Sequence, residues 1–410
     1  MEKQAKALKI ALIGTRGVPA RHGGFETCAE EIGWRLAERG HQVIVYSKRY
    51  KKEHLSSYRG MQVVYIPRLP FKGIETLFAA FLSALHSLFL KCDIHMVFDS
   101  ANSPVLYLFN FFRKKYAINP DGLGWKREKW GRIARIYYKW VEHIVAHFSP
   151  NIVADSKAIS NYYENEYHAQ STVIEYGAEL PATVSKEQEE MILAKYGLQP
   201  YSYILQITRF EPENNPLLTI KAFLAAQTDL KLMIIGGASK KTPYAKQIQQ
   251  EAERTDKVIL PGFIYDKDVL NVIWQNSLFY VHGNSVGGTN PALLQAMAAG
   301  RPIAAIDCVF NRETMNNNGY FFDRSVSSLA RIIQIINNDN LDAKQYAANN
   351  LKRIESHYNW ERITNLYENL FFELSLPDLS KCGKRFSKWF QITKELPFLC
   401  RISKPVVQNA

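Results

Sequence analysis

The sequence predicts an α/β protein with two consecutive parallel β-sheets. The chain has 410 residues, which is too long for one comfortable core and favours two domains of roughly 150 to 200 residues each. Short apolar runs alternate with helical stretches along most of it, as they do in parallel sheets joined by right-handed crossovers. Ligands of such sheets bind at the carboxyl ends of the strands, so the functional loops should follow strands.

Twelve apolar, β-prone runs give the expected strands in chain order. Those of the first half lie at residues 9–14, 42–46, 62–66, 94–98, 116–119, 152–154 and 172–175. Those of the second half lie at residues 202–207, 231–235, 257–260, 277–281 and 302–306. A polar, proline-marked stretch at residues 180–190 separates the two groups. We therefore expect an N-terminal domain over residues 1–185, a C-terminal domain over residues 186–374 and a basic aromatic tail over residues 375–410.

Composition indicates a globular protein of a reducing compartment. Apolar residues make up 47% of the chain and charged ones 22%, which is unlike a disordered sequence. The five cysteines are odd in number, widely scattered and without metal-ligand spacing, so we interpret them as reduced thiols in a cytosolic protein. The N-terminus moves at once into a predicted strand with no small-residue cleavage site, so we expect no signal peptide.

The formal net charge of +12 is unevenly placed. Residues 1–185 hold 25 Lys/Arg against 17 Asp/Glu, residues 186–374 hold 19 against 20, and residues 375–410 hold 7 against 2. The excess at the two ends of the chain suits an anionic partner, and the candidates are a membrane surface, a lipid diphosphate or nucleic acid. A merely soluble basic surface is the alternative.

The segment 280–302, YVHGNSVGGTNPALLQAMAAGRP, has the makeup of a phosphate cradle. An apolar strand precedes it, and Gly287 and Gly288 form a turn whose backbone can approach a ligand closely. Asn290 followed by Pro291 is typical of a helix N-cap with proline at the first helical position. The free N–H groups and positive dipole end of that helix would hold a diphosphate. An ordinary strand–helix unit, with glycines that serve only packing, is the alternative.

The loop 14–27, GTRGVPARHGGFET, follows the first predicted strand. Its glycine spacing does not match the dinucleotide fingerprint, and the next strand ends in Ser-Lys-Arg where that fingerprint needs an acidic residue. A nicotinamide enzyme is therefore disfavoured. Arg16, Arg21 and His22 would instead approach an anionic substrate over the sheet edge, unless the loop is only a tight turn with solvated charges.

Two further clusters follow predicted strands. In NPDGLGWKREKW, residues 119–130, Trp125 and Trp130 offer flat faces for a sugar and Asp121 a carboxylate for a hydroxyl, while Lys126, Arg127 and Lys129 suit phosphate. A proline turn whose tryptophans belong to the core is the alternative. In RFEPENNP, residues 209–216, Arg209 is a good diphosphate clamp, although an isolated arginine is more often a surface ion-pair partner.

Five ordered motifs resemble the bacterial rhamnosyltransferase group, which lies within the retaining glycosyltransferase family 4 and has the GT-B fold. They are GxRGxPxxxGGFET at 14–27, NPDGLxWKRxKW at 119–130, YGA at 176–178, RFEPENN at 209–215 and VGGTNPxLLxAMAAG at 286–300. The likeness runs from about Lys9 to Phe372. It implies two Rossmann-like domains whose parallel sheets face each other across a cleft.

The resemblance also implies the substrates and their place. The second domain would bind a nucleotide-sugar, dTDP-L-rhamnose for this group, and the first a lipid-diphosphate-linked saccharide used for a bacterial surface polysaccharide. No cofactor and no metal are implied, and the chain contains no DxD motif. The protein would work in the cytoplasm, peripheral on the inner face of the cell membrane.

The same resemblance assigns site residues. Arg209 would hold the donor diphosphate with the helix that starts at Pro291, and would stabilise the leaving group. Asp121 and His22 are the candidates for positioning the acceptor hydroxyl, and with Arg209 they form the catalytic set. The candidate donor-binding residues are Arg209, Glu211, Asn214, His282, Gly287, Gly288, Thr289, Asn290 and Gln295. The candidate acceptor-binding residues are Arg16, Arg21, Gly23, Gly24, Phe25, Trp125, Lys126 and Arg127.

Four positions depart from the wider family pattern. Gln295 and Gly124 stand where glutamates are expected, Asn214 where a lysine is, and Asn284 where the group often has histidine. These departures motivate a second hypothesis, a nucleotide-sugar-binding protein that has lost transferase activity. A third, a nucleic-acid-binding protein, is prompted by the charge alone, and the chain has no recognition motif for it, so we expect no nucleic-acid partner.

Two segments bear on membrane contact. Residues 74–90 are an apolar stretch of marginal length for a span, and Glu75, His86 and its place between strands favour a buried or surface-docked helix. The tail mixes Lys/Arg with phenylalanine and tryptophan, as an interfacial anchor does. A plain C-terminal packing helix is the alternative for the tail.

Overall fold

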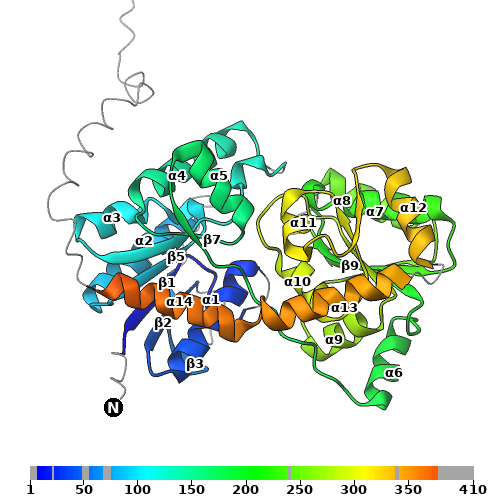
Figure 1. Cartoon of the computed structure of the whole chain (residues 1–410), viewed down its shortest axis with the longest axis horizontal. Coiled ribbons are helices and arrows are strands. Elements are labelled where there is room, and N and C mark those ends of the chain that lie inside the picture. The colour runs from blue at the N-terminus through cyan, green and yellow to red at the C-terminus, as the bar shows by residue number, and fades with distance from the viewer. Residues whose placement is uncertain are drawn as a thin grey trace, which may run out of the picture.

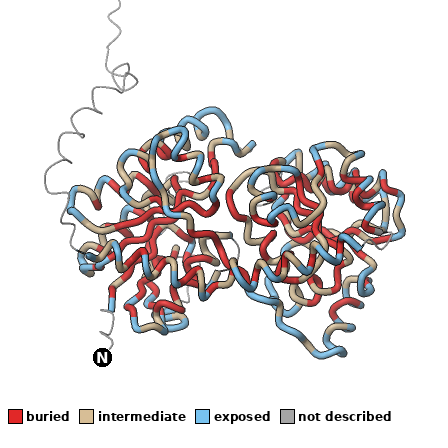
Figure 2. The backbone as a smooth tube through the Cα atoms, viewed as in Figure 1, coloured by how far each residue is buried: buried red, intermediate tan, exposed pale blue. Residues whose placement is uncertain are grey.

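The computed structural model describes residues 7–20, 23–48, 55–67, 75–128, 130–238, 242–337 and 341–376. Two α/β halves lie side by side, each with a parallel sheet covered by helices (Figure 1). The strands form the buried interior of each half and the outer helical faces are exposed (Figure 2). The predicted α/β fold with two parallel sheets is confirmed.

The first sheet has the strand order β3-β4-β2-β1-β5-β6-β7-β8. Its pairs are parallel except β3 with β4, which is a short antiparallel edge. The strands are β1 Lys9–Ile13, β2 Gln42–Lys48, β3 Ser57–Tyr58, β4 Met61–Ile66, β5 Ile94–Phe98, β6 Lys115–Asn119, β7 Ile152–Ala154 and β8 Ser171–Val173. All five residues of β5 are buried, as expected for a central strand with both faces covered.

The second sheet is entirely parallel and has the strand order β11-β10-β9-β12-β13-β14. In chain order this is 3-2-1-4-5-6, the arrangement of a doubly wound nucleotide-binding sheet. The strands are β9 Tyr203–Arg209, β10 Lys231–Gly237, β11 Val258–Gly262, β12 Phe279–His282, β13 Ile303–Ile306 and β14 Tyr320–Phe322. Each of the twelve expected strands is present, and only β3 and β14, of two and three residues, are not expected from the sequence.

Helices connect these strands and cover both faces of each sheet. Those of the first half are α1 Gly24–Glu38, α2 Glu75–Phe89, α3 Val105–Phe111, α4 Arg132–Phe148 and α5 Lys157–Tyr167, with short 3-10 turns η1 Ser100–Asn102 and η2 Gly124–Lys126. The others are α6 Lys186–Lys195, η3 Pro212–Asn214, α7 Pro216–Ala226, α8 Pro243–Ala252, α9 Lys267–Asn276, α10 Pro291–Ala298, α11 Val309–Met315, α12 Val326–Asn337, α13 Leu341–Ser356 and α14 Trp360–Ser375.

The apolar helix α2 docks on the first sheet. It contacts β1, β4 and α3 and buries its alanine and serine side. Among the residues that the structure describes, no helix combines the length and apolarity needed to cross a membrane. The expectation of a docked helix at residues 74–90 is confirmed, whereas the tail from residue 377 onward lies outside the described residues.

The last helix corrects the expected extent of the second domain. The sequence assigns residues 360–374 to it, but α14 packs against α1 and also contacts β5 and β6 of the first half (Figure 1). Arg39 pairs with Glu361 at 2.8 Å and with Glu368 at 2.6 Å, which fixes α14 along α1. Because this packing joins segments more than 300 residues apart, local sequence pattern does not reveal it.

The chain crosses between the halves twice, and the two crossings run side by side. The Ala178 N–H donates a hydrogen bond to the Tyr358 carbonyl at 2.8 Å. Gly177 lies so close to the Trp360 indole that an added Cβ would be 2.6 Å from the ring. His357 Nε2 is 3.1 Å from the Glu175 carboxylate beside this contact. The crossings therefore form one doubled connection between the sheets.

Replacing Phe371 by alanine is expected to destabilise the first half of the chain. Phe371 on α14 is fully buried, and deleting such a ring costs about 3 to 5 kcal/mol. Scanning calorimetry of the full chain measures the effect. Phe98→Ala in β5 marks the unfolding transition of the first sheet, and Phe279→Ala in β12 marks that of the second.

Phe371→Ala should lower the same transition that Phe98→Ala lowers. If it instead follows Phe279→Ala, α14 is energetically part of the second half and the assignment is wrong. Leu376→Ala serves as the surface control, because Leu376 is 63% exposed and should change stability by less than about 0.5 kcal/mol.

Candidate active site between the two sheets

Each sheet has a point where its strand order reverses, between β1 and β5 in the first and between β9 and β12 in the second. Ligands of open parallel sheets bind outside the carboxyl ends of the strands at this point. The loops that start there contain the sequence motifs at residues 14–27, 209–216 and 280–302. The remaining predicted loop, residues 119–130, follows the neighbouring strand β6.

The phosphate cradle has the local structure that its sequence predicted. Asn290 caps α10 by accepting a hydrogen bond from the Ala292 N–H at 2.9 Å, and Pro291 is the first helical residue. Gly287 has φ 130°, a conformation that only glycine adopts readily. Gly24 at the start of α1 lies opposite, where an added Cβ would be 3.2 Å from Pro291. The N-termini of α1 and α10 therefore meet across the interface.

At the cradle, the two halves contact each other through their backbones. A Cβ added to Gly122, in the loop after β6, would overlap the backbone of Gly287. A Cβ on Gly288 would overlap the carboxylate of Asp155, which follows β7. The Thr289 hydroxyl donates to the Asp155 carbonyl. The cradle is thus completed by loops of the first half, and glycine is required at positions 122 and 288.

Two guanidinium groups, one from each half, are electrostatically coupled at this place. Arg127 pairs with Asp121 at 2.7 Å, and Asp121 raises the pKa of Arg127. Desolvation lowers the pKa of Arg209, and the positive charge of Arg127 lowers it further. The Arg209 residue is nevertheless exposed at the end of β9. An anion between them would be held from both sides, which is what a diphosphate site needs.

A half-buried carboxyl group, Asp99, and a buried one, Asp155, join the site without having been predicted. Burial raises the pKa of Asp99, after β5, to about 6, and the Asp121 charge adds to the effect. Burial likewise raises the pKa of Asp155 well above its usual range, with Asp121 again contributing. Both follow a strand directly, which is the only sequence signal that could have found them.

Buried polar atoms without partners mark the second half of the site. Gln206 Oε1, Glu213 Oε2 and both ring nitrogens of His282 make no hydrogen bond with the residues that the structure describes. Burial lowers the pKa of His282 to about 3, so its imidazole is neutral at physiological pH. Gln206 lies within β9, Glu213 in η3 after that strand, and His282 at the end of β12. A ligand could satisfy such atoms.

Several predicted donor residues have structural partners. Asn214 donates to the Arg209 carbonyl at 3.1 Å and so holds the backbone that carries the guanidinium. Gln295 donates to the Glu179 carbonyl in the connection between the halves at 3.3 Å. Glu211 caps η3 through its backbone and contributes to the field at Arg209. Asn284 accepts from Thr208 at 3.3 Å.

The predicted acceptor side is only partly exposed to a ligand. Arg16 and Gly23 are exposed, Gly24 is half-buried, and Phe25 packs on Phe98 with ring centroids 5.6 Å apart. Lys126 is exposed in η2. Arg21, His22 and Lys129 lie outside the described residues.

The tryptophans that were predicted as sugar platforms pack against α4. Lys139 lies over the Trp125 ring at 4.3 Å, and Trp130 stacks on Tyr138 with ring centroids 5.5 Å apart. Gly124 has no room for a larger residue, because a Cβ would be 2.7 Å from the Tyr138 ring. These half-buried aromatic rings therefore pack on α4, and their role as sugar platforms stays a prediction.

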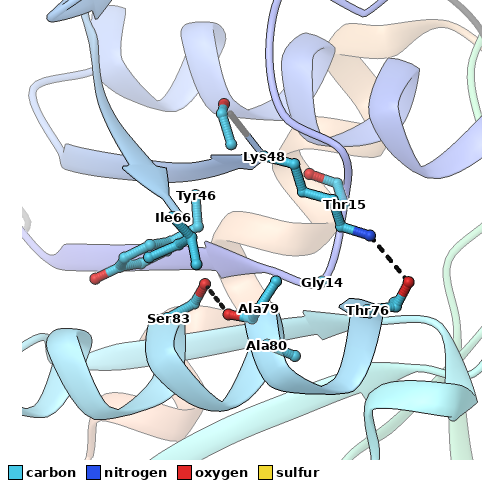
Figure 3. Close-up of a pocket in the computed structure, with 10 residues that line it drawn as sticks. Gly14, Thr15, Tyr46, Lys48, Ile66, Thr76, Ala79, Ala80 and Ser83 are labelled. Atoms are coloured by element: carbon cyan, nitrogen blue, oxygen red, sulfur yellow. Dashed lines mark hydrogen bonds between the residues drawn. The ribbon is translucent and has the colours of Figure 1, made fainter. Parts of the chain in front are cut away.

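A small cavity lies beside the first loop, between the ends of β1, β2 and β4 and helix α2 (Figure 3). Its volume is about 10 Å³, room for about one water molecule. Lys48 donates to the Thr76 hydroxyl at 2.9 Å at its edge, and the Lys48 N–H binds the Arg16 carbonyl. The cavity is too small for a sugar. The hydrogen bonds of Lys48 beside it support the loop that contains Arg16.

Family models of known proteins match both halves of the chain. Residues 189–353 match the family model of glycosyl transferases group 1. Residues 7–179 match a model described as a domain of unknown function (DUF1972). Together the two matches cover most of the described residues, and residues 180–188 lie between them.

Similar solved structures extend over nearly the whole chain. Sucrose-phosphate synthase from Thermosynechococcus elongatus has a TM-score of 0.75 at 19% identity and covers 89% of this chain and 98% of its own. HepE from Anabaena, in complex with UDP and glucose, has a TM-score of 0.73 at 16% identity and covers 89% and 100%. The chain therefore has the GT-B fold, as predicted. The family match and these neighbours support sugar transfer in general terms.

A curated relative, Protein CapJ from Staphylococcus aureus, is 28% identical over 159 residues. The match covers 38% of this chain and 39% of the relative, so the chain spans well under half the length of CapJ. This likeness bears on part of the chain only.

Replacing Gly122 by alanine is expected to loosen the contact between the halves at the cradle. The new Cβ would overlap the Gly287 backbone, and neither loop can yield without breaking the contact. Hydrogen exchange should show lower protection of the amides in residues 286–290.

Gly131→Ala is the matched control, since nothing lies within 4 Å of a Cβ there and its φ of −68° suits any residue. It should leave protection unchanged. Wild-type protection in Gly122→Ala would show that the two loops are not in contact in solution.

The stability of the protein is expected to fall with rising pH because of Asp99. Its pKa is about 6 in the fold and about 3.9 in an unfolded chain, so the folded state binds the proton more tightly. The contribution is complete below about pH 4 and is lost as the pH rises through about 6. Asp99→Asn should therefore gain stability relative to wild type over this window, by at most about 3 kcal/mol.

Denaturant unfolding at several pH values measures this difference. Asp93→Asn, at the other end of β5 and exposed, is the control for removing a surface carboxylate next to the same strand. A constant difference between Asp99→Asn and wild type from pH 4 to about 7 would contradict the burial argument.

Proposed function

We propose that the protein is a glycosyltransferase whose donor diphosphate lies between Arg209 and the N-terminus of α10. The observation that carries the proposal is the meeting of two coupled guanidinium groups and two helix N-termini at one glycine cradle, Gly287 and Gly288. This place concentrates positive charge and free backbone donors at the ends of strands, which suits a diphosphate leaving group.

The finer proposal follows the motif resemblance. The donor is dTDP-L-rhamnose, the acceptor is a lipid-diphosphate-linked saccharide, and the product belongs to a bacterial surface polysaccharide. The protein acts in the cytoplasm, peripheral on the inner face of the cell membrane. The five ordered motifs support this choice, and the complex of HepE with UDP and glucose supports a nucleotide-sugar donor for this fold.

The proposed chemistry is a retaining transfer. The bond from the anomeric carbon to the diphosphate oxygen breaks, and the acceptor oxygen forms a new bond on the same face of the sugar. The acceptor proton passes to the leaving diphosphate oxygen. Arg209 and α10 stabilise the negative charge that develops there. Guanidinium groups and helix N-termini supply this positive charge from the protein itself, so the proposal is metal-independent.

We propose for Asp121 a different role from the one that the sequence suggests. Its carboxylate is engaged by Arg127 at 2.7 Å, and its backbone has φ 69°, an uncommon conformation for a residue with a side chain. We assign it to positioning Arg127 toward the diphosphate. Its expected part in positioning the acceptor hydroxyl would require this ion pair to open.

A nucleotide-sugar-binding protein without transferase activity is the second candidate function. Gln295 favours it, because its amide is bonded to the Glu179 carbonyl and a glutamate at this position could not donate that bond. Both candidates share the donor site, so donor binding tests them together and turnover separates them.

A panel of thymidine, uridine and guanosine diphosphate sugars is expected to identify the donor by thermal stabilisation of the full chain. The rise should be largest with dTDP-L-rhamnose and should persist in EDTA. Arg209→Gln should weaken binding about 10- to 100-fold, since a charged hydrogen bond to phosphate contributes about 1.5 to 3 kcal/mol.

Arg254→Gln is the control, because Arg254 is an exposed arginine of the same half that follows α8 and pairs with Glu251 near the end of that helix. It should bind the sugar like wild type. The absence of any shift with every nucleotide-sugar would overturn both candidate functions. Binding without transfer to a lipid-linked saccharide acceptor would favour the second.

A further inference from the structure

Helix α4 exposes an apolar stripe on the outside of the first half. Ile133 is 86% exposed, Ile136 62% and Trp140 43%. Helical residues follow one another by about 100°, so these three side chains fall within an arc of about 60°. Figure 1 shows α4 at the outer edge of the half, beside α5. Three large apolar residues on one exposed helix face form a coherent patch rather than scattered exposure.

The opposite face of α4 is fixed in the fold, so the stripe cannot turn inward. Val141 and Val145 are fully buried. The Tyr137 hydroxyl donates to the Ala101 carbonyl at 2.8 Å, and the Ser103 hydroxyl donates to the Val141 carbonyl at 3.0 Å. The exposure of the stripe is therefore a property of the folded protein.

Basic side chains of α4 lie beside the stripe, and one acidic side chain, Glu166 of α5, is 3.8 Å from Lys139 on the same edge. Arg132 and Arg135 are exposed along one edge of it, and neither side chain makes an ion pair or hydrogen bond with a residue that the structure describes. No acidic residue occurs from residue 131 to residue 141. Lys139, by contrast, is bonded to Glu142 and to the Tyr162 hydroxyl. An apolar stripe with free cations on its rim matches an anionic lipid surface.

The stripe lies next to the candidate active site. Arg132 follows Arg127 by five residues, which span at most about 18 Å. The turn η2 between them and the site packs against α4, with Gly124 directly on the Tyr138 ring. Whatever binds α4 is therefore brought close to the loop that carries the Asp121–Arg127 pair.

We propose that α4 is a membrane-docking helix, with Ile133, Ile136 and Trp140 inserted among the headgroups of an anionic phospholipid bilayer and Arg132 and Arg135 on lipid phosphates. The proposal rests on the proposed function, because the docked helix presents the site to a lipid-linked acceptor. It places the contact in the folded first half, whereas the sequence pointed to the tail. A second copy of the chain is a poorer occupant, since a two-fold contact would bring the arginines of both copies together.

Vesicle sedimentation of the full-length protein tests the proposal. Wild type should bind vesicles of phosphatidylglycerol and phosphatidylcholine more tightly than vesicles of phosphatidylcholine alone. Ile136→Asp should weaken binding at least about tenfold, because it places a charge within the apolar stripe. Arg135→Gln should weaken binding about fivefold, and only to the anionic vesicles. Met191→Asp on α6 is the matched control, 70% exposed in the second half, and should bind like wild type.

Two outcomes would overturn the proposal. If Ile136→Asp and Arg135→Gln bind vesicles like wild type, the contact lies elsewhere in the chain, the tail included. If Ile136→Asp instead changes the molar mass measured by light scattering, the stripe is an interface between copies of this chain.

Nucleotide-sugar stabilisation of the same variants separates this proposal from the proposed function. Ile136→Asp should keep the sugar response of wild type, which also shows that it is folded. Loss of vesicle binding with an intact sugar response supports the docking helix. Wild type that responds to the sugar and ignores both kinds of vesicle refutes the docking helix alone.

Discussion

The doubled connection between the halves is the constraint on which the rest of the structure depends. The Ala178–Tyr358 hydrogen bond and the contact of Gly177 with Trp360 hold two crossings together, and α14 then ties the second crossing to α1. One crossing would act as a flexible tether. Two crossings that are bonded to each other limit the relative motion of the sheets to rotation about a narrow axis, so their carboxyl edges stay opposed.

Because the carboxyl edges of the two sheets face each other closely, glycine occupies the cradle. The first half reaches the second with backbone at Gly122 and with the buried carboxyl of Asp155, which a side chain on Gly288 would overlap. At Gly287 the backbone conformation, φ 130°, favours glycine. The two halves of the chain also contribute different charged groups to this contact. The carboxyl groups with raised pKa values, Asp99 and Asp155, come from the first half, whereas Glu211 and Glu213 come from the second. The coupled guanidinium groups come from both halves, and the N-termini of α1 and α10 meet at the seam. An anionic ligand at the seam satisfies both sides, so ligand binding and the approach of the halves favour each other.

Much of this was accessible from sequence because it is locally encoded. Strand interiors such as β5 are continuous apolar runs, and Asn290 with Pro291 fixes the start of α10 whatever lies nearby. The pairing of α14 with α1 depends instead on contacts across more than 300 residues, and no local pattern carries it. The two-residue edge β3 is too short to have a pattern at all. The candidate site likewise has some features that local sequence encodes and others that depend on distant residues. The position of Arg209 was predictable because it follows a strand, whereas the packing of Trp125 was not, because Lys139 reaches its face from a helix that begins after the motif ends.

The departures from the family pattern have local causes that connect the site to α4. Glycine at position 124 lets η2 lie flat on Tyr138, and this contact locks the Asp121–Arg127 loop onto the same helix whose outer face carries the apolar stripe. A glutamate there would push the loop away from α4. Gln295 similarly exchanges a charge for a hydrogen bond to Glu179 in the doubled connection. Each replacement adds a contact or a hydrogen bond beside the proposed donor site. Both are therefore compatible with a donor site that is supported differently from the family pattern.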